Sequence, residues 1–308
     1  MNIGSIVAVT DFSAHGNHAL ERAAQLSATH GAPLQLMYSP PDGDPANPSA
    51  AVCLAHASRQ LAQRYSLNAR PIAKVANSVA HIAEEARSAD LLVLAQWRYP
   101  ALRAFWLGPL SERVLRRSDC PLLVIKSVPH RRYSRILVAV DLTAQASALV
   151  GVASAIEPDS GIELFHTIST QIESKLRFAH VSGDIIEAYR NDCLRRARER
   201  MERFAGSLDV PSHRISHAVG RGDPGRQAAI RQQADGAGLV VVGKRRSSRL
   251  TDLLAGSVAQ SVLRSASSDV LVVPHDFRSV ARPVFSRMPA AIRDDGATGF
   301  SAASGSAS

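Results

Sequence analysis

An internal repeat is the feature that most constrains how this 308-residue chain can fold. Three segments of the first half recur, in the same order, in the second half. The pairs are residues 6–13 (IVAVTDFS) with 136–143 (ILVAVDLT), 89–95 with 237–243, and 120–125 with 268–273. The first offset is 130 residues and the later two are 148, so the second copy contains about 18 additional residues between them. Self-similarity of this kind predicts two similar structural units in tandem.

The repeated runs are almost continuously apolar, which is typical of strands buried on both faces of a parallel sheet. Helical patterns lie between the runs, with apolar residues at steps of three or four. In the second copy they are Ile186, Tyr189, Cys193, Ala197, Met201, Phe204 and Leu208, and in the first copy Leu54, Ala57, Leu61 and Tyr65. Alternating strands and helices predict the α/β class, with a parallel sheet covered by helices on both faces.

The repeat also predicts the limits of the units. We expect the first copy to occupy residues 1–129 and the second to occupy residues 130–275, beginning with a short basic linker. Residues 276–308 end in a sequence rich in Ala, Gly and Ser, which predicts a disordered tail.

Composition excludes some classes of protein. No apolar run approaches the ~20 residues needed to cross a bilayer, so no membrane partner is expected. The three cysteines, Cys53, Cys120 and Cys193, are odd in number and none are spaced as a CxxC motif. With an N-terminus unlike a signal peptide, this indicates a reducing compartment and a cytoplasmic protein. A net charge of +9 permits acidic partners without selecting one.

Candidate ligand-binding residues follow the predicted strands of the second copy, because ligands of open parallel sheets bind beyond the carboxyl ends of the strands. Asp141 follows the first strand and could accept a hydrogen bond from a base or ribose. It could equally cap the next helix, and Thr143 is another candidate cap.

The segment Gly220–Pro224 (GRGDP) follows the presumed third strand. Gly222 permits backbone angles that other residues avoid, and Pro224 suits the first turn of a helix. A structural turn is the favoured interpretation of this segment.

The strongest candidate is the segment between Gly243, which ends a strand, and Gly256-Ser257-Val258, which open a helical pattern. Glycines let a phosphate approach the backbone, and the free N–H groups and dipole of a helix N-terminus favour an anion. The Ser257 hydroxyl could add a hydrogen bond. Positive charge is supplied nearby by Lys244, Arg245, Arg246 and Arg249. The alternative is a mobile basic loop.

These residues resemble the universal stress protein family, whose pattern is Gly, two residues, Gly, nine residues, Gly, then Ser or Thr. The second copy has Gly243, Arg246, Gly256 and Ser257 at the four positions, so three match. The resemblance covers roughly residues 1–275 as a tandem pair. It implies two Rossmann-like domains of the adenine nucleotide alpha-hydrolase type, each with a five-stranded parallel sheet.

In this family some members bind ATP or AMP and others bind no nucleotide. The resemblance places Asp141 near the adenine and ribose, and Gly243, Gly256, Ser257 and Val258 around the phosphates, with Mg²⁺ accompanying ATP. Arg246 replaces the second glycine of the pattern. Its Cβ could block a backbone angle that glycine allows, or its charge could reach a phosphate, and both interpretations stay open.

The first copy departs further from the family pattern. Its four positions are Ala95, Arg98, Gly108 and Pro109, so only one matches, and proline has no N–H to offer a phosphate. We predict that this copy does not bind ATP, and that Asp11 serves as a helix cap. Four aromatic residues crowd its degenerate loop and predict either a partner surface or a plug: Trp97, Tyr99, Phe105 and Trp106.

The predicted function is therefore a cytoplasmic, non-catalytic stress-response protein whose second domain binds ATP or a related adenine nucleotide. The family also implies that the copies pair through their last strands as an internal pseudo-dimer, with further homo-oligomers available. The alternatives are an interaction module for an unknown protein partner and, less favoured, a nucleic-acid binder using the Arg-rich helix over residues 190–203, whose acidic residues instead indicate a solvated face. Neither a catalytic nucleophile pair nor a metal site is legible.

Overall fold

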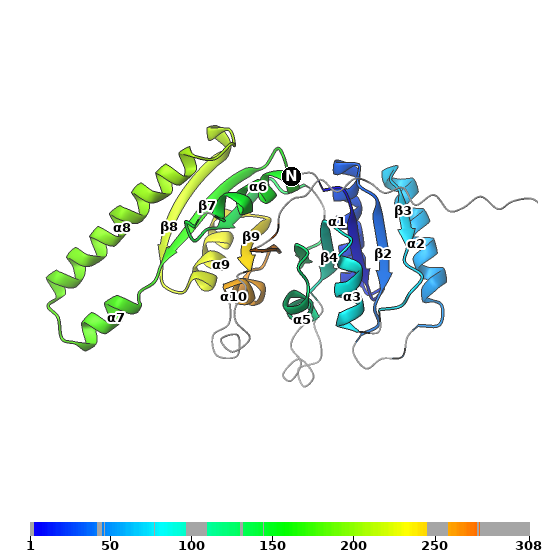
Figure 1. Cartoon of the computed structure of the whole chain (residues 1–308), viewed down its shortest axis with the longest axis horizontal. Helices are drawn as coiled ribbons and strands as arrows, with labels where there is room; N and C mark the ends of the chain where they lie inside the picture. The colour runs from blue at the N-terminus through cyan, green and yellow to red at the C-terminus, as the bar shows by residue number, and fades with distance from the viewer. Residues whose placement is uncertain are drawn as a thin grey trace, which may run out of the picture.

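The computed structural model describes residues 3–41, 45, 47–76, 78–96, 110–129, 132–143, 145–244, 258–275 and 277. Its strands form one mixed sheet in the order β3-β2-β1-β4-β5-β10-β9-β6-β7-β8 (Figure 1). The strands of the first copy are β1 (Ile6–Thr10), β2 (Leu34–Tyr38), β3 (Ala69–Pro71), β4 (Leu91–Ala95) and β5 (Leu122–Ile125). Those of the second copy are β6 (Arg135–Ala139), β7 (Gly161–Ile168), β8 (Ile215–Arg221), β9 (Leu239–Lys244) and β10 (Asp269–Pro274). Within each copy the five strands pair in parallel, as predicted.

The helices lie on both faces of this sheet. They are α1 (Ala14–His30), α2 (Ala50–Tyr65), α3 (Val79–Ala86), α5 (Leu110–Arg117), α6 (Ala146–Ile156), α7 (Gln171–Phe178), α8 (Gly183–Gly206), α9 (Pro224–Asp235) and α10 (Val258–Ser265). Every residue of β1, β4, β5 and β10 is buried, because helices cover both of their faces. The continuous apolar runs of the sequence are therefore the central strands, as their pattern indicated.

The two copies join through β5 and β10, which pair antiparallel with Leu123 opposite Leu271. The pairing of last strands that the sequence predicted is thus present inside one chain. Because this is the one antiparallel pairing among the described strands, the carboxyl ends of the strands of one copy lie at the opposite edge of the sheet from those of the other. Helices α5 and α10 lie side by side at this junction (Figure 1).

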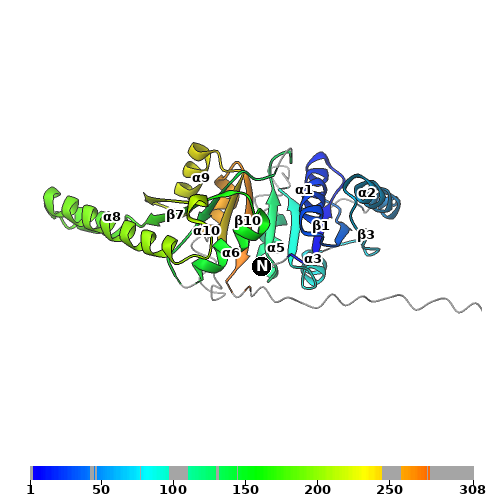
Figure 2. The same ribbon diagram turned by 90° about the horizontal axis from the view of Figure 1, so that it is seen from above.

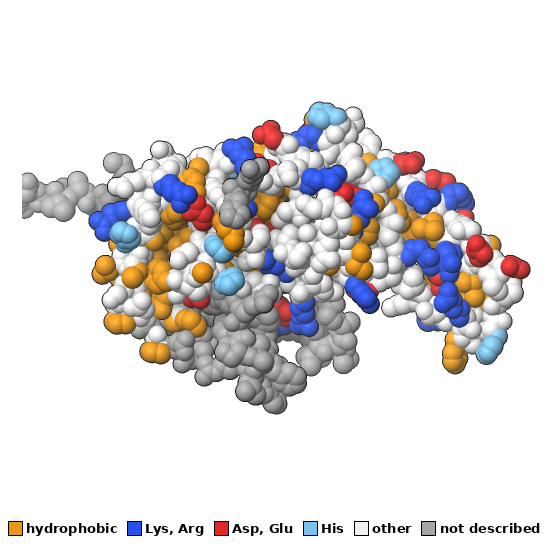
Figure 3. Space-filling view, turned by 180° about the vertical axis from the view of Figure 1, so that it is seen from behind, with side chains coloured by type: hydrophobic (Ala, Val, Ile, Leu, Met, Phe, Trp, Pro, Cys, Tyr) orange, Lys and Arg blue, Asp and Glu red, His pale blue; other side chains and the backbone are white. Residues whose placement is uncertain are grey.

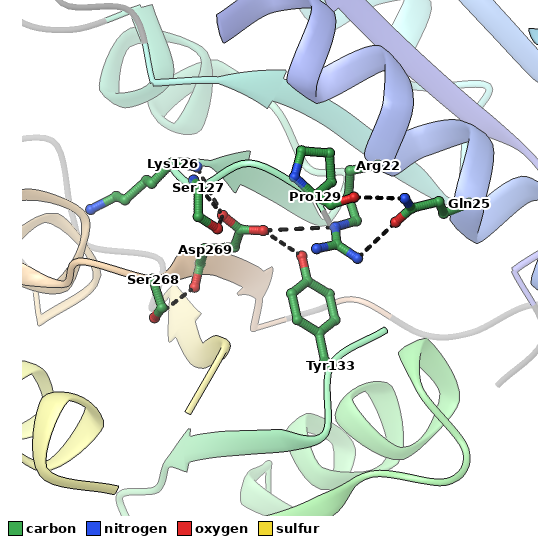
Figure 4. A network of polar contacts seen from close by, with 8 residues as sticks. All are labelled: Arg22, Gln25, Lys126, Ser127, Pro129, Tyr133, Ser268 and Asp269. Atoms are coloured by element: carbon green, nitrogen blue, oxygen red, sulfur yellow. Dashed lines mark hydrogen bonds and ion pairs between the residues drawn. The ribbon is translucent and has the colours of Figure 1, made fainter. Parts of the chain in front are cut away.

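Asp269, the first residue of β10, gathers polar groups from both copies at the junction (Figure 4). Its buried carboxylate accepts hydrogen bonds from the Lys126 and Ser127 backbone N–H groups at 2.9 and 3.1 Å. It also accepts one from the Tyr133 hydroxyl at 2.7 Å, and the Arg22 guanidinium lies 3.8 Å away. These contacts hold the start of the second copy against the end of the first.

The additional residues of the second copy build an arm from α7 and α8, which extends away from the sheet (Figures 1 and 2). The strands are longer as well: β7 has eight residues, whereas β2, its counterpart in the first copy, has five. Of the apolar stripe predicted between residues 186 and 208, Ile186, Ala197 and Met201 are buried in α8. Acidic and basic side chains mingle along the arm (Figure 3), where Arg195 pairs with Asp192 and Glu199.

Helix ends follow local sequence signals. Ser13 caps α1 by accepting a hydrogen bond from the Gly16 N–H, and Gly31 ends that helix in a left-handed conformation with φ of +62°. Among the described residues, none of the helices combines the length and the apolar character that crossing a membrane would require.

Candidate functional site

A cavity of about 320 Å³ opens at the carboxyl edge of the second copy. It lies beyond β6, β7, β9 and β10, and the beginnings of α6, α9 and α10 complete its lining. Strand β6 lies between β9 and β7. The chain passes from β6 to β7 on one side and returns later to β9 on the other side. This is the topological switch point at which open α/β sheets bind ligands.

The walls of the cavity are mostly apolar. Val140, Leu149, Phe165, Val242 and Val273 contribute aliphatic and aromatic surface. A Cβ at Gly220 would lie only 2.6 Å from the Phe165 ring, so the glycine allows this ring to pack against the β8 backbone. An apolar slot of this kind suits the faces of a flat ring.

Asp141 and Thr143 both line the cavity, at the end of β6. Asp141 Oδ1 accepts hydrogen bonds from the Thr143 backbone N–H at 3.1 Å and from its hydroxyl at 2.6 Å. Helix α6 then begins at Ala146 without a side-chain cap. The alternative that Asp141 or Thr143 caps this helix is therefore wrong, because Gln145 occupies the N-cap position and no side chain donates or accepts a capping hydrogen bond there.

The first copy shows the related arrangement with a different outcome. Asp11 Oδ1 accepts from the Ser13 N–H at 2.9 Å and from its hydroxyl at 2.6 Å, and Ser13 is the residue that caps α1. The prediction that Asp11 is itself the cap is therefore wrong: Asp11 orients the cap.

Gly222 has a φ of +123°, a conformation that residues with a side chain rarely adopt. Asp223 then caps α9 by accepting from the Arg226 N–H at 2.8 Å, and Pro224 occupies the first turn. Pro224 contributes to the cavity lining, whereas Gly222 is not among the lining residues. The turn interpretation of this segment agrees with that geometry.

At the other end of the cavity, Gly243 and Val258 lie on the lining, from the end of β9 and the start of α10. A Cβ at Gly243 would approach Leu149 to 3.3 Å, so the glycine keeps this part of the wall close to the backbone. Three predicted site residues, Arg246, Gly256 and Ser257, lie outside the described residues. So do Arg245 and Arg249, and both interpretations of Arg246 remain predictions.

The ammonium of Lys244 contacts the first copy, and the part of this residue in phosphate binding stays a prediction. Although parts of it line the cavity, its ammonium donates hydrogen bonds to the carbonyls of Leu115 and Ser118, at 2.5 and 3.3 Å. Those carbonyls belong to the C-terminal end of α5 in the first copy. The charge of Lys244 is therefore directed at the neighbouring copy, where helix carbonyls attract cations.

Sequence reasoning missed His166, His275 and Phe277, which also contribute to the lining. His166 Nδ1 lies 2.9 Å from the Val140 carbonyl, which fixes the orientation of the ring. The register of the repeat could have identified His166, because it follows Phe165 at the carboxyl end of β7. Phe277 lies beyond residue 275, where the second copy was expected to end, so no repeat pattern marked it.

The corresponding edge of the first copy is filled differently. The rings of Phe12 and Tyr38 stack with centroids 5.0 Å apart and an interplanar angle of 13°. By the repeat and by strand register, they correspond to Leu142 and His166 of the second copy. The Tyr38 hydroxyl accepts from the Asn47 N–H at 3.2 Å, which holds its ring in place. The predicted aromatic plug or partner surface at Trp97, Tyr99, Phe105 and Trp106 lies outside the described residues.

Across the described part of the chain, no three His, Cys, Asp or Glu side chains come together as metal ligands would. Among the described residues that line the cavity, Asp141 is the one carboxylate.

Comparisons with known proteins agree on one family. The model of the Universal stress protein family matches residues 2–126 and 132–274, once in each copy. Universal stress protein Rv2005c from Mycobacterium tuberculosis is 29% identical over 197 residues, which cover 61% of this chain and 63% of that protein. The match thus covers less than two thirds of the length of that relative.

Solved structures show the same fold. A universal stress protein from Archaeoglobus fulgidus superposes with a TM-score of 0.65 at 18% identity, over 88% of this chain and 96% of that one. Protein PA1789 from Pseudomonas aeruginosa, described as functionally unknown, gives a TM-score of 0.65 at 21% identity, over 88% and 92%.

Proposed function

Because the chain belongs to the universal stress protein family, we propose that it is a stress-response protein whose second copy binds ATP or a closely related adenine nucleotide. Binding, rather than turnover, is the proposed activity.

One observation carries this proposal: Asp141, Gly243 and Val258, which lie far apart in the sequence, line the same cavity. The family resemblance assigns Asp141 to the base and ribose end and the other two to the phosphate end. The cavity volume of about 320 Å³ is within the range of small-molecule sites. Its apolar walls suit a base, and the beginning of α10 offers N–H groups to an anion.

Mg²⁺ would be bound mainly through the nucleotide. It prefers oxygen ligands and usually keeps several waters, and Asp141 is the carboxylate that the described lining offers. This donor set fits a metal carried by ATP better than a metal held by the protein alone. In the first copy, the stacked Phe12 and Tyr38 rings support the proposal that this half binds no nucleotide.

Equilibrium titration with fluorescently labelled ATP tests the proposal, with Val258→Asp as the decisive variant. Val258 is 39% exposed and opens α10, so an aspartate there is compatible with the fold and favourable to the helix dipole. Its negative charge would nevertheless repel a phosphate. We expect saturable binding by the parent protein and by Val258→Asn, and binding weakened at least about tenfold by Val258→Asp. Absence of saturable binding by the parent protein would refute the proposal.

A second candidate function is an interaction module in which neither copy binds nucleotide. It is favoured by the arm, where Phe178 is 87% exposed and Ile172 and Ile185 are also exposed. Large apolar side chains that are exposed to solvent can mark a contact with another protein. The same titration separates the candidates, because this function predicts no saturable ATP binding.

Three further expectations belong to the proposal. We propose that residues 1–129 and 130–275 form the two units. We also propose a cytoplasmic location, since Cys53, Cys120 and Cys193 are all free thiols. Because β5 and β10 are already paired within the chain, association between chains would use another surface.

A further inference from the structure

Helix α10 connects the cavity to the first copy over only eight residues. Val258, its first residue, lines the cavity, and Arg264 lies in its last turn. In so short a helix, contacts that hold the C-terminal turn also fix the position of the N-terminal turn. The contacts of the last turn of α10 therefore influence where Val258 lies in the cavity lining.

The first contact is an ion pair between the copies. Arg264 Nε and Nη2 donate to the two carboxylate oxygens of Glu112 in α5, at 2.8 and 2.9 Å. Glu112 is only 2% exposed, although Arg264 is 66% exposed. A two-point contact of a guanidinium with a carboxylate constrains direction as well as distance. It fixes α10 against α5 of the degenerate copy.

The second contact caps the helix. Lys126, which follows β5 of the first copy, donates from Nζ to the carbonyls of Leu263 and Ala266, at 2.5 and 2.7 Å. These carbonyls lie at the C-terminal end of α10, where a helix leaves its last carbonyls without partners and carries partial negative charge. The first copy thus supplies the cation that satisfies them.

A third contact runs in the other direction. Lys244 ends β9 on the lining of the cavity, and its ammonium donates to the Leu115 and Ser118 carbonyls at the end of α5. The last residue of β9 and the whole of α10 flank the segment 245–257 at its two ends. Both flanks are therefore held by the first copy.

We propose that the first copy, which has lost the family's nucleotide motif, positions the phosphate end of the site in the second copy through Glu112 and Lys126. This inference rests on the proposed function and deepens it. Glu112 and Lys126 are positioning residues, since they act on the cavity through α10. The degenerate copy then supports the binding site through α10.

The test compares ATP affinity among folded variants. We expect Glu112→Gln and Lys126→Gln to weaken ATP binding about tenfold, within the usual range of coupling between sites. The matched control is His30→Gln, which alters a different contact between the copies: His30 Nε2 lies 3.3 Å from the Ile156 carbonyl, at the junction of α1 and α6. This control should change the affinity by less than about twofold. All titrations are made well below the melting temperature of the least stable variant.

A second measurement does not depend on ATP. Amide hydrogen exchange in nucleotide-free protein should be faster in α10 of Glu112→Gln and Lys126→Gln than in His30→Gln, while β9 and β10 keep their protection. If the parent protein binds no ATP, the proposed function is wrong. Independently of ATP, equal exchange in α10 of Glu112→Gln, Lys126→Gln and His30→Gln would overturn the positioning role. If the parent binds ATP and both variants bind it equally well, or if His30→Gln loses as much affinity as they do, the inference is wrong.

Discussion

The Tyr133 hydroxyl donates a 2.7 Å hydrogen bond to Asp269 Oδ2, and both residues are buried where the two copies meet. Tyr133 lies just before β6, whereas Asp269 begins β10, so the bond joins the two ends of the second copy. The Arg22 guanidinium of the first copy lies 4.2 Å from the centre of the Tyr133 ring. Burial of this kind makes the polar network costly to disrupt.

Asp269→Asn tests how much this network stabilises the junction. An amide would direct two N–H groups toward donors that now share a carboxylate, so we expect the free energy of unfolding to fall by about 2–4 kcal/mol. Urea denaturation followed by circular dichroism measures the loss. Tyr133→Phe removes one donor and should cost about 1–2 kcal/mol. A larger loss from Tyr133→Phe than from Asp269→Asn would contradict the central place given to the carboxylate.

Lys126 predicts a pH dependence of stability. Burial lowers the pKa of Lys126 from 10.5 to about 8, although the nearby Asp269 carboxylate opposes this change. Between these values the unfolded chain binds more protons than the folded chain, so the contribution of Lys126 to the free energy of unfolding increases with pH. We expect Lys126→Met to remove an increase of about 1 kcal/mol between about pH 8 and 9.5. Denaturation of both proteins across this range checks it, and equal slopes would show the prediction to be wrong.

Gly225 is needed for α9 to pack against α10. A Cβ at this position would lie 2.3 Å from both Cβ and Oγ of Ser261. Gly225→Ala should therefore push the helices apart and lower the free energy of unfolding by about 1–3 kcal/mol. Ser261→Gly removes the obstructing atoms, so the same Gly225→Ala change should cost less in that background. Thermal unfolding of the four proteins measures the coupling, and strictly additive losses would exclude this steric explanation.

Glu173 attaches the arm to the sheet. Its carboxylate accepts from Arg221 Nη2 at 2.5 Å, and Arg190 of α8 lies at 3.4 Å. Burial raises the pKa of Glu173, but Arg221 and then Arg190 outweigh it, so the pKa lies below 4.5. The anchor is thus charged at neutral pH and is lost as the pH falls through this lowered pKa.

Glu173→Gln should free the arm without unfolding the sheet. We expect trypsin to cut within residues 171–214 about tenfold faster, because the energy for local opening falls there. Mass spectrometry locates the cuts, and Glu187→Gln, a change at another acidic position of the arm, is the control. Equal cleavage rates in the two variants would show that Glu173 does not anchor the arm.

Much of the architecture follows from local sequence. The repeated apolar runs predicted buried parallel strands in both copies, because a strand covered by helices on both faces must be apolar on both. The number of five strands in each copy was implied by the family resemblance. The turn at Gly222 and Pro224 is equally local, since the backbone of one glycine and the ring of one proline decide it. Asp141 and Gly243 were identified because ligands of open parallel sheets bind beyond the carboxyl ends of the strands, whereas Val258 was assigned to the phosphate end by the family resemblance.

The direction of a long side chain could not be predicted from the local sequence. Lys244 follows a strand at the predicted phosphate end, yet its ammonium reaches Leu115 and Ser118, residues 129 and 126 positions earlier in the chain. The sequence by itself determined the repeat, the strands, the edge that carries the cavity and the loss of the family pattern in the first copy. Only the tertiary structure decided which charges face that cavity and which hold the copies together. The reason is physical: a long, flexible cation is drawn to the nearest uncompensated carbonyls, and the antiparallel pairing of β5 with β10 brings the end of α5 to Lys244.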